Sequence, residues 1–277
     1  MREEIEAGGR NRTFELVGGP GAQDLLLVFH GSKQTGAKHR AFTGRAYDAL
    51  TEGGTAAIAY LDGYRGNWND ARRGSSFPAR VDGVDDVGFA RAVIGRLAPE
   101  RVFAIGYSNG GQMVLRLMHE VPGLLTGAAV IAATMPAPDN FLFPDAAPAP
   151  MPVLLVHGTK DPIVSYDGGE MSWWARRMFK VGGRSLSMPE TAAYFAARNG
   201  ITAPPALSTT NEVEITEYAQ PGHPPVALYT VHGGGHTIPG PHSAPFVLGR
   251  TNHDVNTALV IQEFFGVQKA DRSPKTA

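Results

Sequence analysis

Short apolar runs of strand length alternate along the chain with longer amphipathic stretches. The runs predict strands at residues 12–17, 25–30, 55–61, 101–106, 127–134, 152–157 and 226–231. Most of them are continuously apolar, which is typical of strands buried on both faces of a parallel sheet. The amphipathic stretches predict helices at 40–52, 83–97, 109–120, 189–199 and 252–265. This alternation predicts an α/β fold with a mostly parallel central sheet flanked by helices.

The same pattern gives no sign of a division into separate domains. The proline-rich stretch 135–152 lies between two core-like strands, so we interpret it as a loop and not as a linker. We therefore predict one domain over residues 1–277, with 267–277 as a flexible tail.

Composition and charge exclude several classes of partner. With 25 Lys and Arg against 26 Asp and Glu, the net charge is −1, which does not favour nucleic acid or an anionic membrane surface. The longest strongly apolar stretch, 128–135, is far shorter than the roughly 20 residues that span a bilayer. The first residues lack the apolar core of a signal peptide, so we expect a cytoplasmic protein, or an extracellular one if a signal has been removed.

The stretch "AIGYSNGGQM" (104–113) contains a G-x-S-x-G motif around Ser108. In a chain with 34 glycines the motif alone is weak evidence, and a structural turn serine is the alternative. Here a predicted strand precedes Gly106 and a predicted helix follows, which is the strand–turn–helix context of a nucleophile elbow. Glycines at 106 and 110 would let the neighbouring backbone approach closely. We therefore predict that Ser108 is a nucleophile.

A serine hydroxyl needs a base to accept its proton. Of the nine histidines, His236 in "VHGGGHTIPG" follows a predicted strand in a glycine-rich loop, and we predict that it is this base. His232 and His242 lie close by in sequence and are the alternatives.

The base in turn needs a carboxylate that orients it. Asp161 in "VHGTKDPIV" follows another predicted strand, and open α/β sheets place their sites at this end of the strands. Asp167 is the alternative, and we interpret His157 as a structural histidine at the strand end.

The loop after the strand at 25–30 reads "HGSKQTG" and predicts half of an oxyanion hole. Such a hole uses the backbone N–H of the residue after the nucleophile and a second N–H from an early strand loop. We assign these donors to Asn109 and Ser32, with Lys33 as the alternative to Ser32.

Taken in order, six stretches give the chain a family resemblance over nearly its whole length. They are "VFHGSKQTG", "YLDGYRGNWNDAR", "VDDVGFARAVI", "RVFAIGYSNGGQM", "MPVLLVHGTKDPIV" and "GGGHTIPG". With them the chain resembles the α/β-hydrolase esterases that include poly(3-hydroxybutyrate) depolymerases and feruloyl esterases. The resemblance implies an α/β-hydrolase fold, a triad of Ser108, Asp161 and His236, and an oxyanion element in the "HGS" loop. It also implies cleavage of esters through an acyl-enzyme, without a cofactor.

Three residues are predicted to contact the substrate: Trp68, Tyr107 and Ile238. Trp68, in "GNWND", could line the cleft or hold a long loop in place. Ile238 stands where family members often have tryptophan, which predicts an altered pocket wall. The segment 172–180 could form a lid, but its spacing of Trp and Met favours a partly buried amphipathic segment.

The sequence thus predicts a serine carboxylic ester hydrolase that acts on small-molecule or oligomeric esters. A peptidase of the prolyl-oligopeptidase type and a non-catalytic binding protein on the same fold are the alternatives. We expect no metal, because the "HGGGH" histidines lie in a loop and the chain has no cysteines. Acyl specificity, the alcohol and the oligomeric state are not predicted by these motifs.

Overall fold

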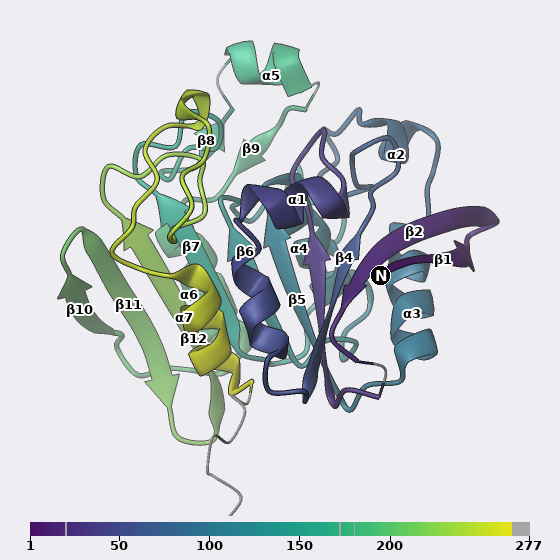
Figure 1. Cartoon of the computed structure of the whole chain (residues 1–277). Helices are drawn as coiled ribbons and strands as arrows, with labels where there is room; N and C mark the ends of the chain where they lie inside the picture. The colour runs from purple at the N-terminus through teal and green to yellow at the C-terminus, as the bar shows by residue number, and fades with distance from the viewer. Residues whose placement is uncertain (20, 172, 180, 268–277) are drawn as a thin grey trace, which may run out of the picture.

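A ten-stranded sheet forms the centre of the chain in the computed structural model, which describes residues 1–19, 21–171, 173–179 and 181–267. The sheet has the order β1-β2-β4-β3-β5-β6-β7-β12-β11-β10 (Figure 1). Its strands are β1 (Arg2–Ala7), β2 (Arg10–Val17), β3 (Asp24–Phe29), β4 (Ala56–Leu61), β5 (Arg101–Tyr107), β6 (Gly127–Ile131), β7 (Val153–Gly158), β10 (Ala206–Thr210), β11 (Val213–Gln220) and β12 (His223–Val231). A separate pair joins β8 (Gly169–Glu170) to β9 (Arg184–Ser185).

The middle of the sheet is parallel and its margins are antiparallel. Strands β4, β3, β5, β6, β7 and β12 run parallel, whereas β1 and β2 at one margin and β11 and β10 at the other pair antiparallel. The predicted mostly parallel sheet is therefore confirmed. Because the parallel strands all end at one edge, the loops that follow them come together there.

Helices cover both faces of the sheet. One hydrophobic cluster packs α3 (Asp86–Leu97), α4 (Asn109–Glu120) and α6 (Met188–Arg198) against one face. A second cluster packs the 3-10 helix η1 (Ala46–Thr51) and α7 (Thr257–Phe265) against the other, where α1 (Gly36–Phe42) also lies in front of the sheet (Figure 1). The short elements α2 (Pro78–Val81), α5 (Trp173–Phe179) and the 3-10 helix η2 (Phe246–Leu248) lie toward the end where the parallel strands stop (Figure 1).

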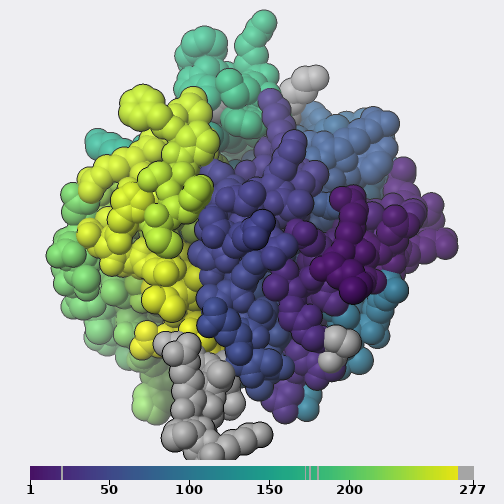
Figure 2. Space-filling view, viewed as in Figure 1, coloured from purple at the N-terminus to yellow at the C-terminus, as the bar shows by residue number. Residues whose placement is uncertain are grey.

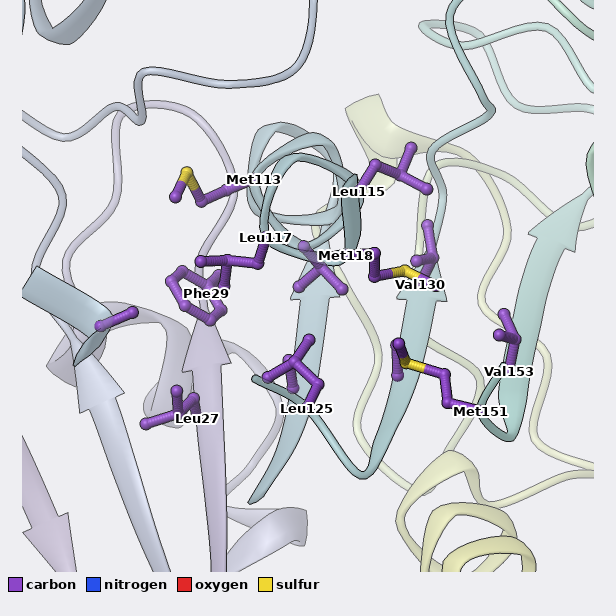
Figure 3. Close-up of a cluster of buried hydrophobic side chains, with 14 of the residues drawn as sticks. Leu27, Phe29, Met113, Leu115, Leu117, Met118, Leu125, Val130, Met151 and Val153 are labelled. Carbon is purple, nitrogen blue, oxygen red and sulfur yellow. The ribbon is translucent and has the colours of Figure 1, made fainter. Parts of the chain in front are cut away.

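Helix α4 is held by a dense apolar interface. Met113, Leu117 and Met118 lie over the sheet, close to Phe29 of β3 and Val130 of β6 (Figure 3). All five side chains are almost completely buried. Burial of apolar area stabilises a fold by about 25 cal/mol per Å². The packing therefore fixes the first turn of α4 above the end of β5.

The C-terminal helix closes the opposite face. Figure 2 shows the C-terminal residues in yellow packed directly beside the blue-violet segment that contains η1. Buried side chains from the two elements, Tyr47 and Leu50 of η1 and Ile261 and Phe265 of α7, belong to one cluster. The predicted tail, 267–277, lies outside the described residues after Val267. Along the part of the chain that the structure describes, every helix is too short or too polar to cross a membrane.

Several predicted boundaries are wrong for local reasons. The helix predicted at 40–52 is interrupted, because Gly44 (φ 61°) and Arg45 (φ 62°) adopt left-handed backbone conformations between α1 and η1. The strand predicted at 127–134 ends at Ile131, where Ala132 takes φ 51°. The last helix begins five residues later than predicted, with Asn256 as its N-cap: its side chain accepts a hydrogen bond from the N–H of Ala258.

Three marginal strands, β1, β10 and β11, were not predicted. All five residues of β10 are exposed, and β1 is mostly charged or polar with only Ala7 buried. Such strands carry little apolar periodicity, because their side chains face water and their pairing depends on the adjacent strand.

Candidate active site

Ser108 lies in a tight turn between β5 and α4. Its backbone has φ 54° and ψ −116°, a conformation that a residue with a side chain rarely adopts. The Ser108 N–H donates to the carbonyl of Ile131 on β6 at 2.9 Å, which holds the turn against the neighbouring strand. Ser108 is the N-cap of α4, but its hydroxyl makes no capping hydrogen bond. The hydroxyl is therefore available for chemistry.

Two glycines make this turn possible. A Cβ on Gly106 would collide with the backbone carbonyl of Gly110, and a Cβ on Gly110 would collide with the carbonyl of Phe29. The close backbone approach expected from the G-x-S-x-G motif is therefore present. It brings the first turn of α4 directly against the end of β3.

Asp161 and His236 lie in contact at the same edge of the sheet. The distance from His236 Nδ1 to Asp161 Oδ2 is 2.7 Å, and the two side chains are 4% and 0% exposed. The other carboxylate oxygen, Oδ1, accepts hydrogen bonds from the N–H groups of Ile163 and Val164, both at 2.8 Å. The carboxylate is thus fixed, and it directs one oxygen at the imidazole.

The surroundings of Asp161 favour its charged form. Burial of the carboxyl favours the neutral form, but the electrostatic interaction with the His236 imidazole and hydrogen bonds from His157 and His236 outweigh it. The pKa of Asp161 therefore lies well below its usual range. At neutral pH the group is a carboxylate that can stabilise an imidazolium on His236.

His157 is a second imidazole beside Asp161. Its Nε2 lies 2.9 Å from the carbonyl oxygen of Val164 and 3.3 Å from Asp161 Oδ2, and its side chain is fully buried. Its Nδ1 is buried without a hydrogen-bond partner among the described residues. Because a carbonyl can only accept, Nε2 carries the proton. The sequence identified His157 as a strand-end histidine but did not predict its contact with Asp161, four residues later.

The alternative residues lie elsewhere. His232 is half-exposed, and the nearest carboxylate oxygen is 3.8 Å away on Glu214. His242 lies beside Gly44, and Asp167 is exposed. In the described ranges, no group of three His, Cys, Asp or Glu side chains is arranged to hold a metal ion.

Two adjoining pockets open at Ser108. The first contains Ser108 and His236 together with Gly31, Ser32, Gln34, Tyr107, Ile163, Phe179 and Leu248. The second contains Ser108 and Asn109, and it extends between apolar and polar side chains that include Phe77, Val181, Arg72, Gln112 and Asn140. Ser32, Ile163 and Phe179 line both pockets. Ser108 thus lies where the two pockets meet, as a reacting group between the two halves of an ester would.

The two candidates for the early-loop oxyanion donor have different surroundings. Lys33 takes φ 63°, and its N–H donates to the carbonyl of Gly66 at 2.7 Å, so this donor is already used. Ser32 lines the pocket with Asn109, the first residue of α4. The positive end of the α4 dipole also points at this place.

Of the three predicted substrate contacts, only Tyr107 lines a pocket at Ser108. Its hydroxyl donates to the carbonyl of His236 at 2.6 Å, and burial raises its pKa well above the usual range. Ile238 lines a separate pocket with Phe42 and Tyr47 and does not reach Ser108. Trp68 is fully buried and lines neither pocket at Ser108. The structure thus places Ile238 and Trp68 outside the two pockets that contain Ser108.

The segment predicted as lid or amphipathic helix contains α5. Its described part, 173–179, is mostly apolar. Phe179 lines both pockets, whereas Trp173 and Met178 are exposed. Residues 172 and 180 lie outside the described ranges.

Several proteins described as esterases are similar to this chain. A family model described as Phospholipase/Carboxylesterase matches residues 88–178. "Putative esterase NocK" of Nocardia uniformis subsp. tsuyamanensis is 32% identical over 292 residues, covering 94% of this chain and 81% of that protein. Feruloyl esterase B of Piromyces equi is 29% identical over 226 residues, covering 79% of this chain and 40% of that protein.

Solved structures share the fold at low sequence identity. The acetyl xylan esterase from Aspergillus awamori superposes with a TM-score of 0.60 at 12% identity, covering 97% of this chain and all of that one. A carboxylesterase from Mesorhizobium loti gives 0.52 at 16% identity, with coverage of 92% and 94%. With the sheet topology and the match to NocK, these findings show that the chain belongs to the α/β-hydrolase family of carboxylic ester hydrolases.

Proposed function

We propose that this protein cleaves carboxylic esters through an acyl-enzyme formed on Ser108. The observation that carries the proposal is the 2.7 Å contact between His236 and a buried, charged Asp161, in a chain where His236 lines the same pocket as Ser108. A base oriented by a carboxylate beside a serine in a strained turn is the arrangement that activates a hydroxyl.

The reaction then follows from the roles of these groups. His236 Nδ1–H donates to Asp161, so Nε2 is free to take the proton from Ser108 as its Oγ attacks the ester carbonyl. A new Oγ–C bond forms and the carbonyl electron pair moves onto oxygen. When the tetrahedral intermediate collapses, the alcohol leaves with the proton from His236. Water, deprotonated by His236, then attacks the acyl-enzyme and releases the acid and the free serine.

The N–H groups of Ser32 and Asn109 bind the oxyanion in this proposal. Ser32 follows β3 and Asn109 begins α4, so the two donors approach from separate segments. Loss of one such donor costs about 100- to 1000-fold in rate. The dipole of α4 adds a favourable field for negative charge at this place.

For the substrate, we propose esters of the type cleaved by polyhydroxybutyrate depolymerases and feruloyl esterases. The similarity to Feruloyl esterase B supports this, as does the pocket at Ser108, whose walls carry both aromatic and polar side chains such as Phe77, Phe179 and Asn140. Ile238 lies away from this pocket, so the absence of tryptophan at 238 does not disfavour an aromatic acyl group. Turnover of methyl ferulate, soluble 3-hydroxybutyrate oligomers and short-chain p-nitrophenyl esters ranks the acyl groups. A matched anilide distinguishes an esterase from a peptidase.

The test of the nucleophile is Ser108→Ala. Hydrolysis of p-nitrophenyl butyrate should fall by at least about 1000-fold, because the acyl-enzyme cannot form. Ser243→Ala is the matched control, since Ser243 is exposed, contacts His253 and lies outside both pockets. Ser108→Ala with a near wild-type rate would show that another group is the nucleophile.

A further inference from the structure

The loop of residues 67–72 lies between the two segments of the proposed oxyanion hole. Two of its fully buried members, Trp68 and Asp70, line neither pocket at Ser108. They therefore cannot touch the substrate. Their hydrogen bonds nevertheless end on the two segments that carry Ser32 and Asn109.

Trp68 bonds to both segments at once. Its backbone N–H donates to Asn109 Oδ1 at 2.9 Å, and its indole Nε1–H donates to the carbonyl of His30 at 2.9 Å. The indole ring also packs against the rings of Phe29 and His30, with centroids 5.1 Å and 4.8 Å away. Trp68 is thus a rigid link between the end of β3 and the first residue of α4.

Asp70 completes the hold on Asn109. Asp70 Oδ2 accepts a hydrogen bond from Asn109 Nδ2 at 2.7 Å and one from Arg72 Nη2 at 2.6 Å, and Oδ1 accepts from the Arg72 N–H at 2.9 Å. Because the Trp68 N–H donates to Asn109 Oδ1, both polar atoms of the Asn109 side-chain amide are held. Because the Cα of Asn109 is thereby fixed, the direction of its N–H is fixed too.

His30 is fixed in the same way on the other segment. Its Nδ1 donates to the Gly31 carbonyl at 2.7 Å, and its Nε2 accepts from the Gly63 N–H at 2.9 Å. Burial lowers the pKa of His30 to about 4, so the ring is neutral at pH 7 and keeps this tautomer. Its carbonyl, bonded to Trp68, lies two residues before Ser32.

We propose that Trp68 and Asp70 are positioning residues that set the spacing of the Ser32 and Asn109 N–H groups in the oxyanion hole. The proposal rests on the proposed function, which assigns these N–H groups to the oxyanion. Catalytic donors must be held within about 0.5 Å of their productive geometry. Here they belong to separate segments, and the hydrogen bonds of Trp68 and Asp70 join these segments in addition to the pairing of β3 with β5. This role explains why Trp68, Asn69 and Asp70 are buried beside the site although none of them lines the pockets at Ser108.

A nearby carboxylate provides the matched control. Asp86 is as buried as Asp70 and belongs to the same region: it accepts hydrogen bonds from the Asn69 N–H and from Arg12 Nη2, both at 2.7 Å. Unlike Asp70, it makes none of its hydrogen bonds to Asn109 or to the His30–Ser32 segment among the described residues. Asp86→Asn therefore measures how disturbing this buried network affects stability and kcat when the hydrogen bonds to Asn109 and to the His30–Ser32 segment are kept.

The experiment compares Trp68→Phe and Asp70→Asn with Asp86→Asn and wild type. For each, kcat and KM are measured on p-nitrophenyl butyrate, with kcat normalised by fluorophosphonate titration of active sites so that unfolded protein is not counted. Binding of a trifluoromethyl ketone, which adds to the serine and places an oxyanion in the hole, is measured alongside.

In Trp68→Phe and Asp70→Asn we expect kcat to fall about 10- to 100-fold, less than the loss of a whole donor. KM should change by less than about threefold, and ketone binding should weaken in parallel with kcat, because only the transition-state interaction is lost. Asp86→Asn should lower the melting temperature and leave normalised kcat within about threefold of wild type.

Wild-type kcat and ketone affinity in Trp68→Phe and Asp70→Asn would overturn the inference. So would an equal loss of normalised kcat in Asp86→Asn, because the network would then act only through general stability. Neither result touches the assignment of Ser108, which Ser108→Ala tests separately. Conversely, an active Ser108→Ala would remove the proposed function on which this inference rests.

Discussion

Two buried carboxylates hold different halves of the proposed site. Asp161 holds the half that contains the base His236, and Asp70 holds the oxyanion half that contains Asn109. Both side chains are 0% exposed, yet Asp161 bonds to imidazoles and Asp70 to a guanidinium and a side-chain amide. In the proposed reaction His236 gains and loses a proton, so the charge beside Asp161 changes in every cycle. Arg72 and Asn109 keep their charge states. The comparison separates a carboxylate that stabilises a transient charge from one that fixes geometry.

This difference orders the expected effects of substitution. Loss of Asp161 removes both the orientation of His236 and the stabilisation of its charged form. Loss of Asp70 leaves the base intact and acts on the direction of the Asn109 donor, while Arg72, which lines the pocket, loses its charged partner. The same change of Asp to Asn should therefore cost far more at 161 than at 70.

The largest effect is expected for Asp161→Asn. The amide can no longer offset the charge of the imidazolium and favours the wrong tautomer of His236, so kcat on p-nitrophenyl butyrate should fall by about 1000- to 10,000-fold. Asp167→Asn, an exposed residue in the same loop, should keep the wild-type rate. If Asp161→Asn lost no more activity than Asp70→Asn, the distinction between the two carboxylates would be wrong.

A smaller effect should come from the second imidazole on Asp161. His157→Phe removes the Nε2–H group, whose nitrogen lies 3.3 Å from Asp161 Oδ2. A single hydrogen bond contributes about 1 kcal/mol, so kcat should fall by about fivefold. His157→Gln retains an N–H and should recover part of the rate. Equal rates in the Phe and Gln variants, with both folded, would mean that His157 only fills space.

The smallest effect is expected in the free energy of unfolding at low pH. Here too the two halves differ, because His30 in the oxyanion half has a shifted pKa in this range and Asp161 does not change its charge. Burial lowers the pKa of His30 to about 4 and that of His39 to about 3, below the ordinary value of 6.5. Between pH 6.5 and about 4 these histidines bind protons in the unfolded chain but not in the folded chain. The free energy of unfolding should therefore fall as the pH drops through this range. Over this range Asp161 keeps its charge, because its pKa lies well below its usual range.

Urea unfolding at a series of pH values measures this slope. His39→Phe removes one of three such titrations, because burial lowers the pKa of His119 to about 4 as well. Position 39 already packs against the rings of Phe42 and Tyr107, so the slope of His39→Phe between pH 6.5 and 4 should be shallower than that of wild type. Identical slopes in the two proteins would show that His39 is protonated in the folded state.

The fold and the location of the site were predictable because local rules govern them. Continuous apolar runs identify buried parallel strands, and the loops after such strands meet at one edge. For this reason the sequence alone groups Ser108, Asp161 and His236, although they are widely separated along the chain. The limits of α4 were predicted without error, because the glycines of the turn mark its start.

What could not be predicted depends on contacts between distant segments. Asp70 meets Asn109 across 39 residues and Trp68 meets His30 across 38, and neither pairing has a periodic signal. The break at Gly44 and Arg45 depends on two left-handed residues inside an otherwise helical pattern. Ile238 was predicted to form part of the pocket wall because family members often have tryptophan at this place, whereas its side chain lines another pocket.

The most direct test of the central claim is the site of covalent labelling by a fluorophosphonate. The account predicts one adduct per folded chain, located by peptide mass spectrometry on Ser108, and loss of labelling in Ser108→Ala with Ser243→Ala labelled as wild type. An adduct on another residue, or folded wild-type protein that takes up no label, would contradict it.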